Sequence, residues 1–335
     1  MKTINSTIRL FLFLFCLLCA TSCKKEKDEK PLKSGTTGDL TWAIYSDGTL
    51  TISGKGKMPD YYDYYSGDPP PPPWTKELVT AVVIKKGVTS IGRIAFSECR
   101  NLTSVTIPNS VTSIGEYAFW GCSGLISVTI PNSVTYIGKG AFYYSSLTIV
   151  VDNGNTAYSS ENGILFNKTK TTLIQYPARK TGAYIIPNSV TFIGHDAFTS
   201  CTGLTSVTIP NSVTRVGILA FSECSGLTSV IIPNSVTHIY AEAFWGCSGL
   251  TSVTIPNSIM FIDQRVFYGC SSLTEIINQQ AIPLLRLYSF DEAGIIYNAF
   301  FGTNITDCTL FVPAGSEEAY RAAPVWQDFG KIVAI

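Results

Sequence analysis

The sequence predicts an α/β repeat solenoid, in which a right-handed coil adds one strand per turn to a single parallel β-sheet. Two observations carry this prediction. Isoleucines recur every 23 residues in two blocks, and the residues around them follow one pattern. The chain is also 45% hydrophobic and only 14% charged, which favours a folded core over disorder. Because a fixed period dictates architecture, the repeat outweighs a domain count based on length.

Residues 1–22 are predicted to be a secretory signal peptide. Lys2 and Arg9 precede an apolar run from Leu10 to Ala20, which is too short to span a membrane. The whole chain carries 24 basic and 24 acidic residues. Without a cationic excess, it is not expected to bind nucleic acid.

The signal ends in Ala20-Thr21-Ser22-Cys23, which resembles a bacterial lipobox, although Ala20 stands where Leu is more usual. The resemblance implies that Cys23 is lipidated. Residues 23–33 would then be a charged, solvated tether. A signal cleaved nearby, with Cys23 incidental, is the alternative.

Residues 34–83 are predicted to form a β-rich N-terminal cap. The runs from Leu40 to Tyr45 and from Thr49 to Ser53 flank Asp47-Gly48, a typical hairpin turn. Such a hairpin would cover the open end of the first coil. The cap also holds a cluster of four tyrosines, five prolines and Trp74. This cluster favours a rigid surface loop, with recognition as a polyproline segment as the alternative. The cluster is Tyr61, Tyr62, Tyr64, Tyr65, Pro69 to Pro73 and Trp74.

Residues 84–277 are predicted to form the solenoid, from seven copies of the pattern L-x-x-V-x-I-P-N-S-V-x-x-I-G-x-x-A-F-x-x-C. Val128 and Ile130 alternate with Thr129, which predicts a short strand with both apolar side chains turned inward. Pro131 ends this strand because proline cannot donate to a ladder. The repeated isoleucines are Ile84, Ile107, Ile130, Ile186, Ile209, Ile232 and Ile255.

The second half of each copy is predicted to be a helical return leg. Val134 and Ile137 approximate helical spacing, as do Ala141 and Phe142 after them, so we expect a short helix or 3₁₀ turn. A single coil buries too few apolar side chains to offset the conformational entropy lost on ordering it. Each coil must therefore stack on its neighbours.

The pattern resembles the leucine-rich repeat class, specifically the 23-residue BspA-like type of bacterial surface proteins. The motif covers residues 84–277, and the similarity extends to both flanks. Ile84-Lys85-Lys86-Gly87 lacks the Pro-Asn-Ser of the other copies, which suits a terminal coil facing a cap. The resemblance implies a surface protein with a role in adhesion.

An irregular insert spans residues 148–183. Within it, residues 163–166 and 172–176 are predicted to form a hairpin around Asn167-Lys168-Thr169-Lys170. We expect this insert to bulge from the solenoid without ending it.

Residues 278–335 are predicted to be a mixed C-terminal cap. Leu310-Phe311-Val312-Pro313 predicts a last strand, and Ser316 to Ala323 a short helix with Ser316 as its N-cap. The residues expected to close the final core are Phe329, Ile332 and Val333.

The repeat cysteines are predicted to be buried free thiols. Six occupy the same slot of successive copies, and Ser145 fills that slot in the irregular copy, so pairing is not required. Neighbours in the column would lie about 5 Å apart, wider than the roughly 3.8 Å Cβ separation that a disulfide prefers. The C-x-x-C from Cys16 to Cys19 lies in the signal peptide, so no metal site is expected. The column is Cys99, Cys122, Cys201, Cys224, Cys247 and Cys270.

No catalytic constellation stands out in the sequence. The two histidines, His195 and His238, occupy different slots, and neither lies in H-E-x-x-H. There is no G-x-S-x-G or Walker-type loop, and the many Ser and Thr residues lack an activating base. We expect neither enzymatic activity nor a cofactor.

Aromatic residues at variable positions are the candidate binding residues. Aromatic rings can anchor a protein partner or stack on a sugar, and they can equally pack between neighbouring coils. The first set follows the buried Phe of its coil and comprises Trp120, Tyr143, Tyr144, Trp245 and Tyr268. The second set varies in another slot and comprises Tyr136, Phe192 and Phe261. The outward strand positions form columns of Ser and Thr, which repetition alone explains better than a binding strip.

Three functional hypotheses follow. The first is a monomeric outer-membrane lipoprotein that binds an extracellular or host-surface protein through the solenoid, as the family resemblance implies. The second is capture of carbohydrate on the aromatic residues, and the third is a passive structural spacer. In each case only the lipid anchor would touch the membrane. We expect the solenoid to face the cell exterior, with the periplasm as the alternative.

Overall fold

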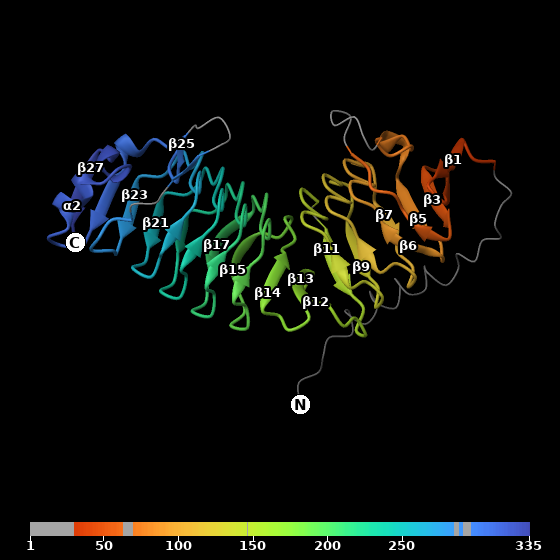
Figure 1. Cartoon of the computed structure of the whole chain (residues 1–335), viewed down its shortest axis with the longest axis horizontal. Coiled ribbons are helices and arrows are strands. Elements are labelled where there is room, and N and C mark those ends of the chain that lie inside the picture. The colour runs from red at the N-terminus through yellow and green to blue at the C-terminus, as the bar shows by residue number, and fades with distance from the viewer. Residues whose placement is uncertain (1–29, 63–69, 146, 285–287, 291–295) are drawn as a thin grey trace, which may run out of the picture.

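The computed structural model describes residues 30–335 except 63–69, 146, 285–287 and 291–295. The predicted signal peptide, Cys23 and most of the tether therefore lie outside the described residues. The chain forms a curved β-solenoid with little helix, which confirms the predicted fold class (Figure 1). Among the described residues, no helix has the length and apolar character needed to cross a bilayer.

The N-terminal cap contains the predicted hairpin, with an additional strand before it. The strands β2 and β3 pair in antiparallel fashion, and β1 pairs with β2 from Lys33 onward. Tyr61 and Trp74 are buried in the cap, whereas Tyr64, Tyr65 and Pro69 lie outside the described residues. The cap elements are β1 (Lys33–Thr37), β2 (Leu40–Ile44), β3 (Thr49–Gly54), β4 (Gly56–Lys57) and η1 (Lys76–Leu78).

The main sheet is parallel and is built from the L-x-x-V-x-I segments, as predicted. It runs in three sections, β3-β5-β7, β9-β11 and β15-β17-β19-β21-β23-β26-β27. The inward Val and Ile residues of most strands are buried, with Val105 and Ile332 only partly so, whereas most outward residues are exposed. Its strands are β5 (Ala81–Ile84), β7 (Ser104–Thr106), β9 (Ser127–Ile130), β11 (Thr148–Val151), β15 (Gly182–Ile185), β17 (Leu204–Thr208), β19 (Ser229–Ile231), β21 (Ser252–Ile255), β23 (Glu275–Asn278), β26 (Thr309–Val312) and β27 (Lys331–Ala334).

The prediction of a helical return leg is wrong, and a second parallel sheet takes its place. The V-x-x-I segments form short strands, which pair in the orders β4-β6-β8-β10 and β14-β16-β18-β20-β22. A helix satisfies its own backbone groups, but here the neighbouring coil offers partners for them at every step. The strands are β6 (Val88–Ile91), β8 (Ser113–Ile114), β10 (Tyr136–Ile137), β16 (Phe192–Ile193), β18 (Arg215–Val216), β20 (His238–Ile239) and β22 (Phe261–Ile262).

The G-x-x-A-F segments are turns that also bond to the next coil. Tyr117 N–H donates to the carbonyl of Lys139 at 3.1 Å, and Phe119 N–H donates to that of Ala141 at 2.8 Å. Tyr117 has a φ of 53°, which lies in the left-handed region and is incompatible with a continuing α-helix. The turn therefore makes hydrogen bonds to the next coil in place of the hydrogen bonds that a helix makes within itself.

Buried columns of Phe and Cys side chains run through the core. Phe96 and Phe119 stack with ring centroids 5.3 Å apart, and the same contact recurs in the coils that follow. Cys122 donates its S–H to the carbonyl of Phe96 at 3.0 Å. Ser145 makes the equivalent bond to Phe119 at 2.6 Å, which explains why Ser can occupy a Cys slot. The predicted burial of the column is confirmed, and burial raises the pKa of Cys99 to about 12.

The insert contains the predicted hairpin, but it joins the solenoid more closely than expected. The strands β13 and β14 are antiparallel, and β12 adds a third strand. Instead of only bulging outward, β14 pairs in parallel with β16 and so enters the second sheet. In Figure 1 the two arms of the solenoid meet at these strands. Their bounds are β12 (Tyr158–Glu161), β13 (Ile164–Asn167) and β14 (Thr172–Gln175).

The C-terminal cap is mixed, as predicted, with one difference at its helix. Ser316 stands at the N-cap, but its hydroxyl donates to the carbonyl of Pro313 at 2.5 Å instead of capping. Phe329 closes the core, and Ile332 is partly buried against it, as predicted. The prediction for Val333 is wrong, because its place in the strand turns it to the outer face of the sheet. The additional elements are β24 (Tyr288–Phe290), β25 (Ile296–Asn298), η2 (Ile305–Asp307), α2 (Glu317–Ala322) and η3 (Trp326–Asp328).

Candidate functional site

The outer face of the main sheet carries an apolar column in the arm that follows the insert. We call this column the outer stripe. Ile185 and Ile231 are each 72% exposed, although they occupy a slot that holds Thr in other copies. Strand pairing places the members side by side in register. They are Ile185, Thr208, Ile231, Thr254, Ile277, Phe311 and Val333.

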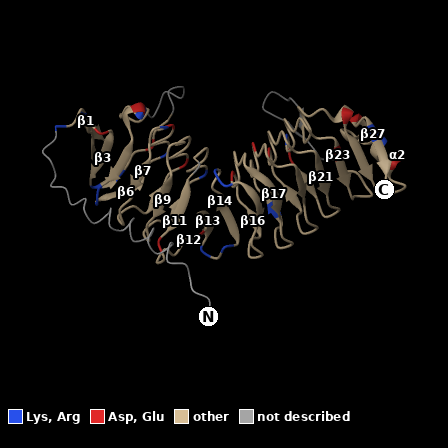
Figure 2. Ribbon diagram, turned by 180° about the vertical axis from the view of Figure 1, so that it is seen from behind, with Lys and Arg blue, Asp and Glu red and all other residues tan. Residues whose placement is uncertain are grey.

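This stripe is not among the sequence-based predictions, which assign the slot to a column of Thr. The signal was present, since Ile stands at positions 185, 231 and 277. In this section of the main sheet, the charged strand residues are Glu275 and Lys331. Figure 2 shows the same sparseness of charge along the strands. The stripe is therefore a rigid, largely uncharged and partly apolar surface.

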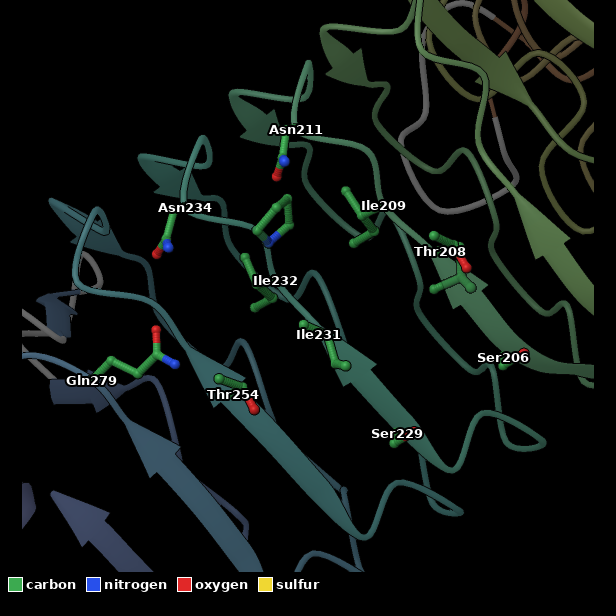
Figure 3. Close-up of a pocket in the computed structure, with 12 residues that line it drawn as sticks. Ser206, Thr208, Ile209, Asn211, Ser229, Ile231, Ile232, Asn234, Thr254 and Gln279 are labelled. Atoms are coloured by element: carbon green, nitrogen blue, oxygen red, sulfur yellow. The ribbon is translucent and has the colours of Figure 1, made fainter. Parts of the chain in front are cut away.

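A hollow of about 510 Å³ lies over the middle of the outer stripe (Figure 3). Ile231 and Thr254 line it from the strands, and Asn211, Asn234 and Gln279 line it from the segments after the strands. A second hollow of about 510 Å³ lies at the β15 end of the stripe and includes Ile185. The amides give this face hydrogen-bonding groups beside its apolar side chains.

The structure brings Phe192 and Phe261 onto one sheet but leaves Tyr136 apart. Phe192, Arg215, His238 and Phe261 stand in register on β16, β18, β20 and β22. The Arg215 guanidinium lies 5.3 Å from the centroid of the Phe192 ring, a cation–π contact. Tyr136 lies on β10, in the other section of the second sheet, and is 53% exposed.

The other five predicted aromatic residues fall into two clusters. Tyr144 contacts both Trp120 and Tyr143, with ring centroids 6.4 Å and 4.3 Å away. In the other arm, Tyr268 stacks on Trp245 at 6.1 Å. It also stacks on Phe301 at 6.2 Å, a residue that the sequence analysis did not select. These rings thus pack largely between neighbouring coils.

Tyr144 also connects the two arms of the solenoid. Its hydroxyl donates to Glu223 Oε1 at 2.7 Å, and the hydroxyl of Ser200 donates to Glu223 Oε2 at 2.8 Å. Burial, followed by the neighbouring Glu223 carboxylate, raises the pKa of Tyr144. The hydroxyl therefore stays protonated and available as a donor at physiological pH.

The two histidines lie near each other in the structure, although they occupy different slots of the repeat. The rings of His195 and His238 each contact Tyr240, at centroid distances of 6.3 Å and 6.2 Å. His195 Nδ1 accepts a hydrogen bond from Ile218 N–H at 2.9 Å. Within the described part of the chain, no group of three or more His, Cys, Asp or Glu side chains is placed to hold a metal ion.

Comparisons with known proteins agree with this architecture. The model of the BspA type leucine rich repeat region matches six copies, over residues 75–184 and 178–297. No curated protein matches the chain significantly.

Three solved structures illustrate the similarity of fold. A leucine-rich repeat protein from Eubacterium ventriosum is 28% identical, with a TM-score of 0.52, covering 82% of this chain and 96% of that one. A leucine rich cell surface protein from Faecalibacterium prausnitzii is 24% identical, with a TM-score of 0.51 and coverage of 75% and 96%. The pneumococcal vaccine antigen PcpA is 17% identical, with a TM-score of 0.57 and coverage of 91% and 99%. The family model spans well over half of the chain, so this protein belongs to the BspA-type leucine-rich repeat family.

Proposed function

We propose that this protein is a non-catalytic surface lipoprotein that binds an extracellular protein through the outer stripe. The observation that carries this proposal is the exposure of Ile185 and Ile231 on a rigid, nearly uncharged sheet. The two isoleucines stand on either side of Thr208 and form a partly apolar surface with it, and exposed apolar patches are typical of interaction sites. Covering one such isoleucine contributes about 1.5–3 kcal/mol.

The dimensions of the sheet face that carries the outer stripe fit part of a protein interface. Seven strands at about 4.8 Å spacing extend over roughly 30 Å, and four residues of strand add a width of roughly 13 Å. The resulting area of roughly 400 Å² is about half of what each partner covers in a standard interface. A partner would therefore also contact the amides of Asn211, Asn234 and Gln279 beside the strands.

The predicted location at the cell surface is compatible with an extracellular protein partner. Lipidation at Cys23 would anchor the chain to the outer membrane ahead of β1, and we place the solenoid on the cell exterior. The outer stripe lies in the arm that follows the insert, and β1 lies at the far end of the other arm (Figure 1). A metabolic fatty-acid probe should label the wild type and not Cys23→Ala, and equal labelling would refute the anchor.

The two other hypotheses have less support. Sugar binding needs accessible aromatic faces, but Trp245 and Tyr268 stack on each other, and Tyr268 stacks on Phe301 as well. A passive spacer would have no need of the exposed isoleucines of the outer stripe.

The test is binding of the purified, unlipidated chain to a panel of extracellular matrix proteins on a biosensor. Saturable binding is expected, and Ile231→Lys should weaken it at least tenfold because it removes apolar contact and buries a charge. Ile126→Lys is the matched control, since Ile126 is 61% exposed in the other arm. Equal affinity of the Ile231 and Ile126 variants would refute the stripe as the interface. Binding only to a glycan array would favour the carbohydrate hypothesis instead.

A further inference from the structure

The turns of neighbouring coils are joined by a regular ladder of backbone hydrogen bonds. In each rung, the residue two places before the buried Phe, directly before the buried Ala, donates to the next coil. Ile94, Tyr117 and Asp196 donate in this way to the carbonyls of Glu116, Lys139 and Ile218 at 3.0, 3.1 and 2.9 Å. The same residue of each coil has a positive φ, for example 53° at Tyr117 and 59° at Asp196.

One rung of this ladder is missing at the insert. Gly140 occupies the donor slot, and the next turn of this type contains His195 and Asp196. Among the described residues, neither Gly140 N–H nor Phe142 N–H finds an acceptor. The reason is that the insert supplies strands to the second sheet but has no G-x-x-A-F turn of its own.

A cavity of about 220 Å³ lies where the rung is missing, and we call it the joint pocket. Phe142, Tyr158 and Phe192 contribute aromatic side chains to its wall, and Gly140 contributes backbone. This volume is below that of most pockets for drug-sized ligands, so it suits a smaller molecule. The apolar wall favours a molecule with an apolar group, and the free Gly140 N–H favours one with a hydrogen-bond acceptor.

Asp196 gives the pocket a buried negative charge. The residue lines the pocket and is only 4% exposed, yet its carboxylate has no hydrogen-bond or ion-pair partner among the described residues. Burial raises its pKa to about 6, and Lys139 acts in the opposite direction. The carboxylate is therefore charged at neutral pH and lacks the partner that a buried charge requires.

Lys139 provides the opposite charge at the rim. It is exposed, lines the same pocket and acts electrostatically on both Asp196 and His195. Lys139 and Asp196 do not form an ion pair with each other. The joint pocket thus presents a buried anion and a rim cation at separate points, which is the complement of a small zwitterion.

We propose that the joint pocket binds a free α-amino acid with an apolar side chain. Its ammonium group would bind Asp196, and its carboxylate would bind Gly140 N–H and Lys139. The side chain would contact Phe142 and Phe192. This site is separate from the outer stripe and does not depend on the function proposed for it.

The test is calorimetric titration of the purified chain with leucine and phenylalanine. One-site saturable binding is expected, and Asp196→Asn should weaken it at least thirtyfold, whereas Lys139→Met should weaken it at least fivefold. Glu242→Gln is the matched control because Glu242 occupies the same slot as Asp196 but is paired with Arg265 at 3.4 Å. A circular dichroism spectrum and a melting curve confirm that each variant is folded.

Ligand analogues test the two charged contacts separately. N-Acetylphenylalanine lacks the ammonium group and phenethylamine lacks the carboxylate, so both should bind at least tenfold more weakly than phenylalanine. Absence of saturable binding by the wild type would overturn the proposal, as would undiminished binding by folded Asp196→Asn. Ile231→Lys should leave amino-acid binding unchanged, so this proposal and the one for the outer stripe can fail independently.

Discussion

Asp196 and Glu242 occupy the same slot of the repeat in two different surroundings. Their φ angles are nearly equal, at 59° and 58°, and both donate a backbone hydrogen bond to the following coil. Glu242 lies in a regular coil and pairs with Arg265 from the next turn. Asp196 lies at the joint between the arms, where Leu219 follows in that slot and the joint pocket lies before it.

This difference separates what the repeat provides from what the insert creates. A regular coil gives each donor of the turn ladder an acceptor and each buried Phe two stacked neighbours. At the joint the Phe column is interrupted, since Phe142 stacks on Phe119 and Tyr176 begins the next stack with Phe198. The same residue types therefore have different energetic roles on the two sides of this boundary.

The largest expected effect is the loss of unfolding free energy when a buried Phe is removed. This loss should differ between a regular coil and the joint. Phe221 stacks on Phe198 at 4.8 Å and on Phe244 at 5.2 Å, so Phe221→Ala should cost about 4–5 kcal/mol of unfolding free energy. Phe142 has a stacked neighbour on one side and the joint pocket on the other, so Phe142→Ala should cost about 3 kcal/mol. Urea unfolding of both variants measures the difference. Equal losses of unfolding free energy would show that Phe142 is packed as tightly as Phe221 despite the joint pocket.

The second effect should be a gain of stability on removing the Asp196 charge. The folded pKa of about 6 lies above the ordinary value of 3.8 for an aspartate, so the folded state holds this proton more tightly than the unfolded state. The resulting destabilisation is absent below about pH 4, grows as pH rises through 6 and is complete above it. The difference between these two pKa values corresponds to about 3 kcal/mol of unfolding free energy. Asp196→Asn should therefore raise the melting temperature at pH 7.5 and not at pH 4.

The groups facing Asp196 do not obscure this measurement. Lys139 is present in both proteins, and Tyr143, whose pKa burial raises, stays neutral throughout the range. His195 titrates in both proteins, so its contribution cancels in the difference between wild type and variant. Glu242→Gln provides the contrast, because losing a partly exposed ion pair should lower stability by at most about 1 kcal/mol. A stabilising Glu242→Gln would contradict the distinction between the two carboxylates.

The repeating part of the fold could be predicted because each inward slot recurs with the same chemistry. Phe119 and Cys122 are buried as the pattern indicates, because a stacked coil leaves them no other surroundings. The return leg could not be assigned in the same way. The spacing of Val134 and Ile137 is compatible with a helix, and only the hydrogen bonds from neighbouring coils decide for a strand.

The candidate sites depend on residues and contacts that do not recur in every copy of the repeat. Ile231 could have been found, because an apolar residue in an outward Thr slot is visible in the sequence. Asp196 could not have been found, because the absence of a partner for its carboxylate depends on the residues on the other side of the joint. That arrangement follows from the pairing of β14 with β16, which joins residues from an irregular segment to a regular one.

The smallest effect tests whether the joint is held by specific polar contacts. Tyr144→Phe removes the hydroxyl that donates to Glu223 across the boundary between the arms, and should cost about 1–2 kcal/mol. Tyr268→Phe is the matched change in a regular coil, where the hydroxyl has no hydrogen-bond partner among the described residues, so stability should be nearly unchanged. Ser200 still donates to Glu223 in the Tyr144 variant, which limits the loss because the carboxylate keeps one partner. Equal melting temperatures for the two variants would mean that packing of the insert, and not the Tyr144–Glu223 bond, holds the arms together.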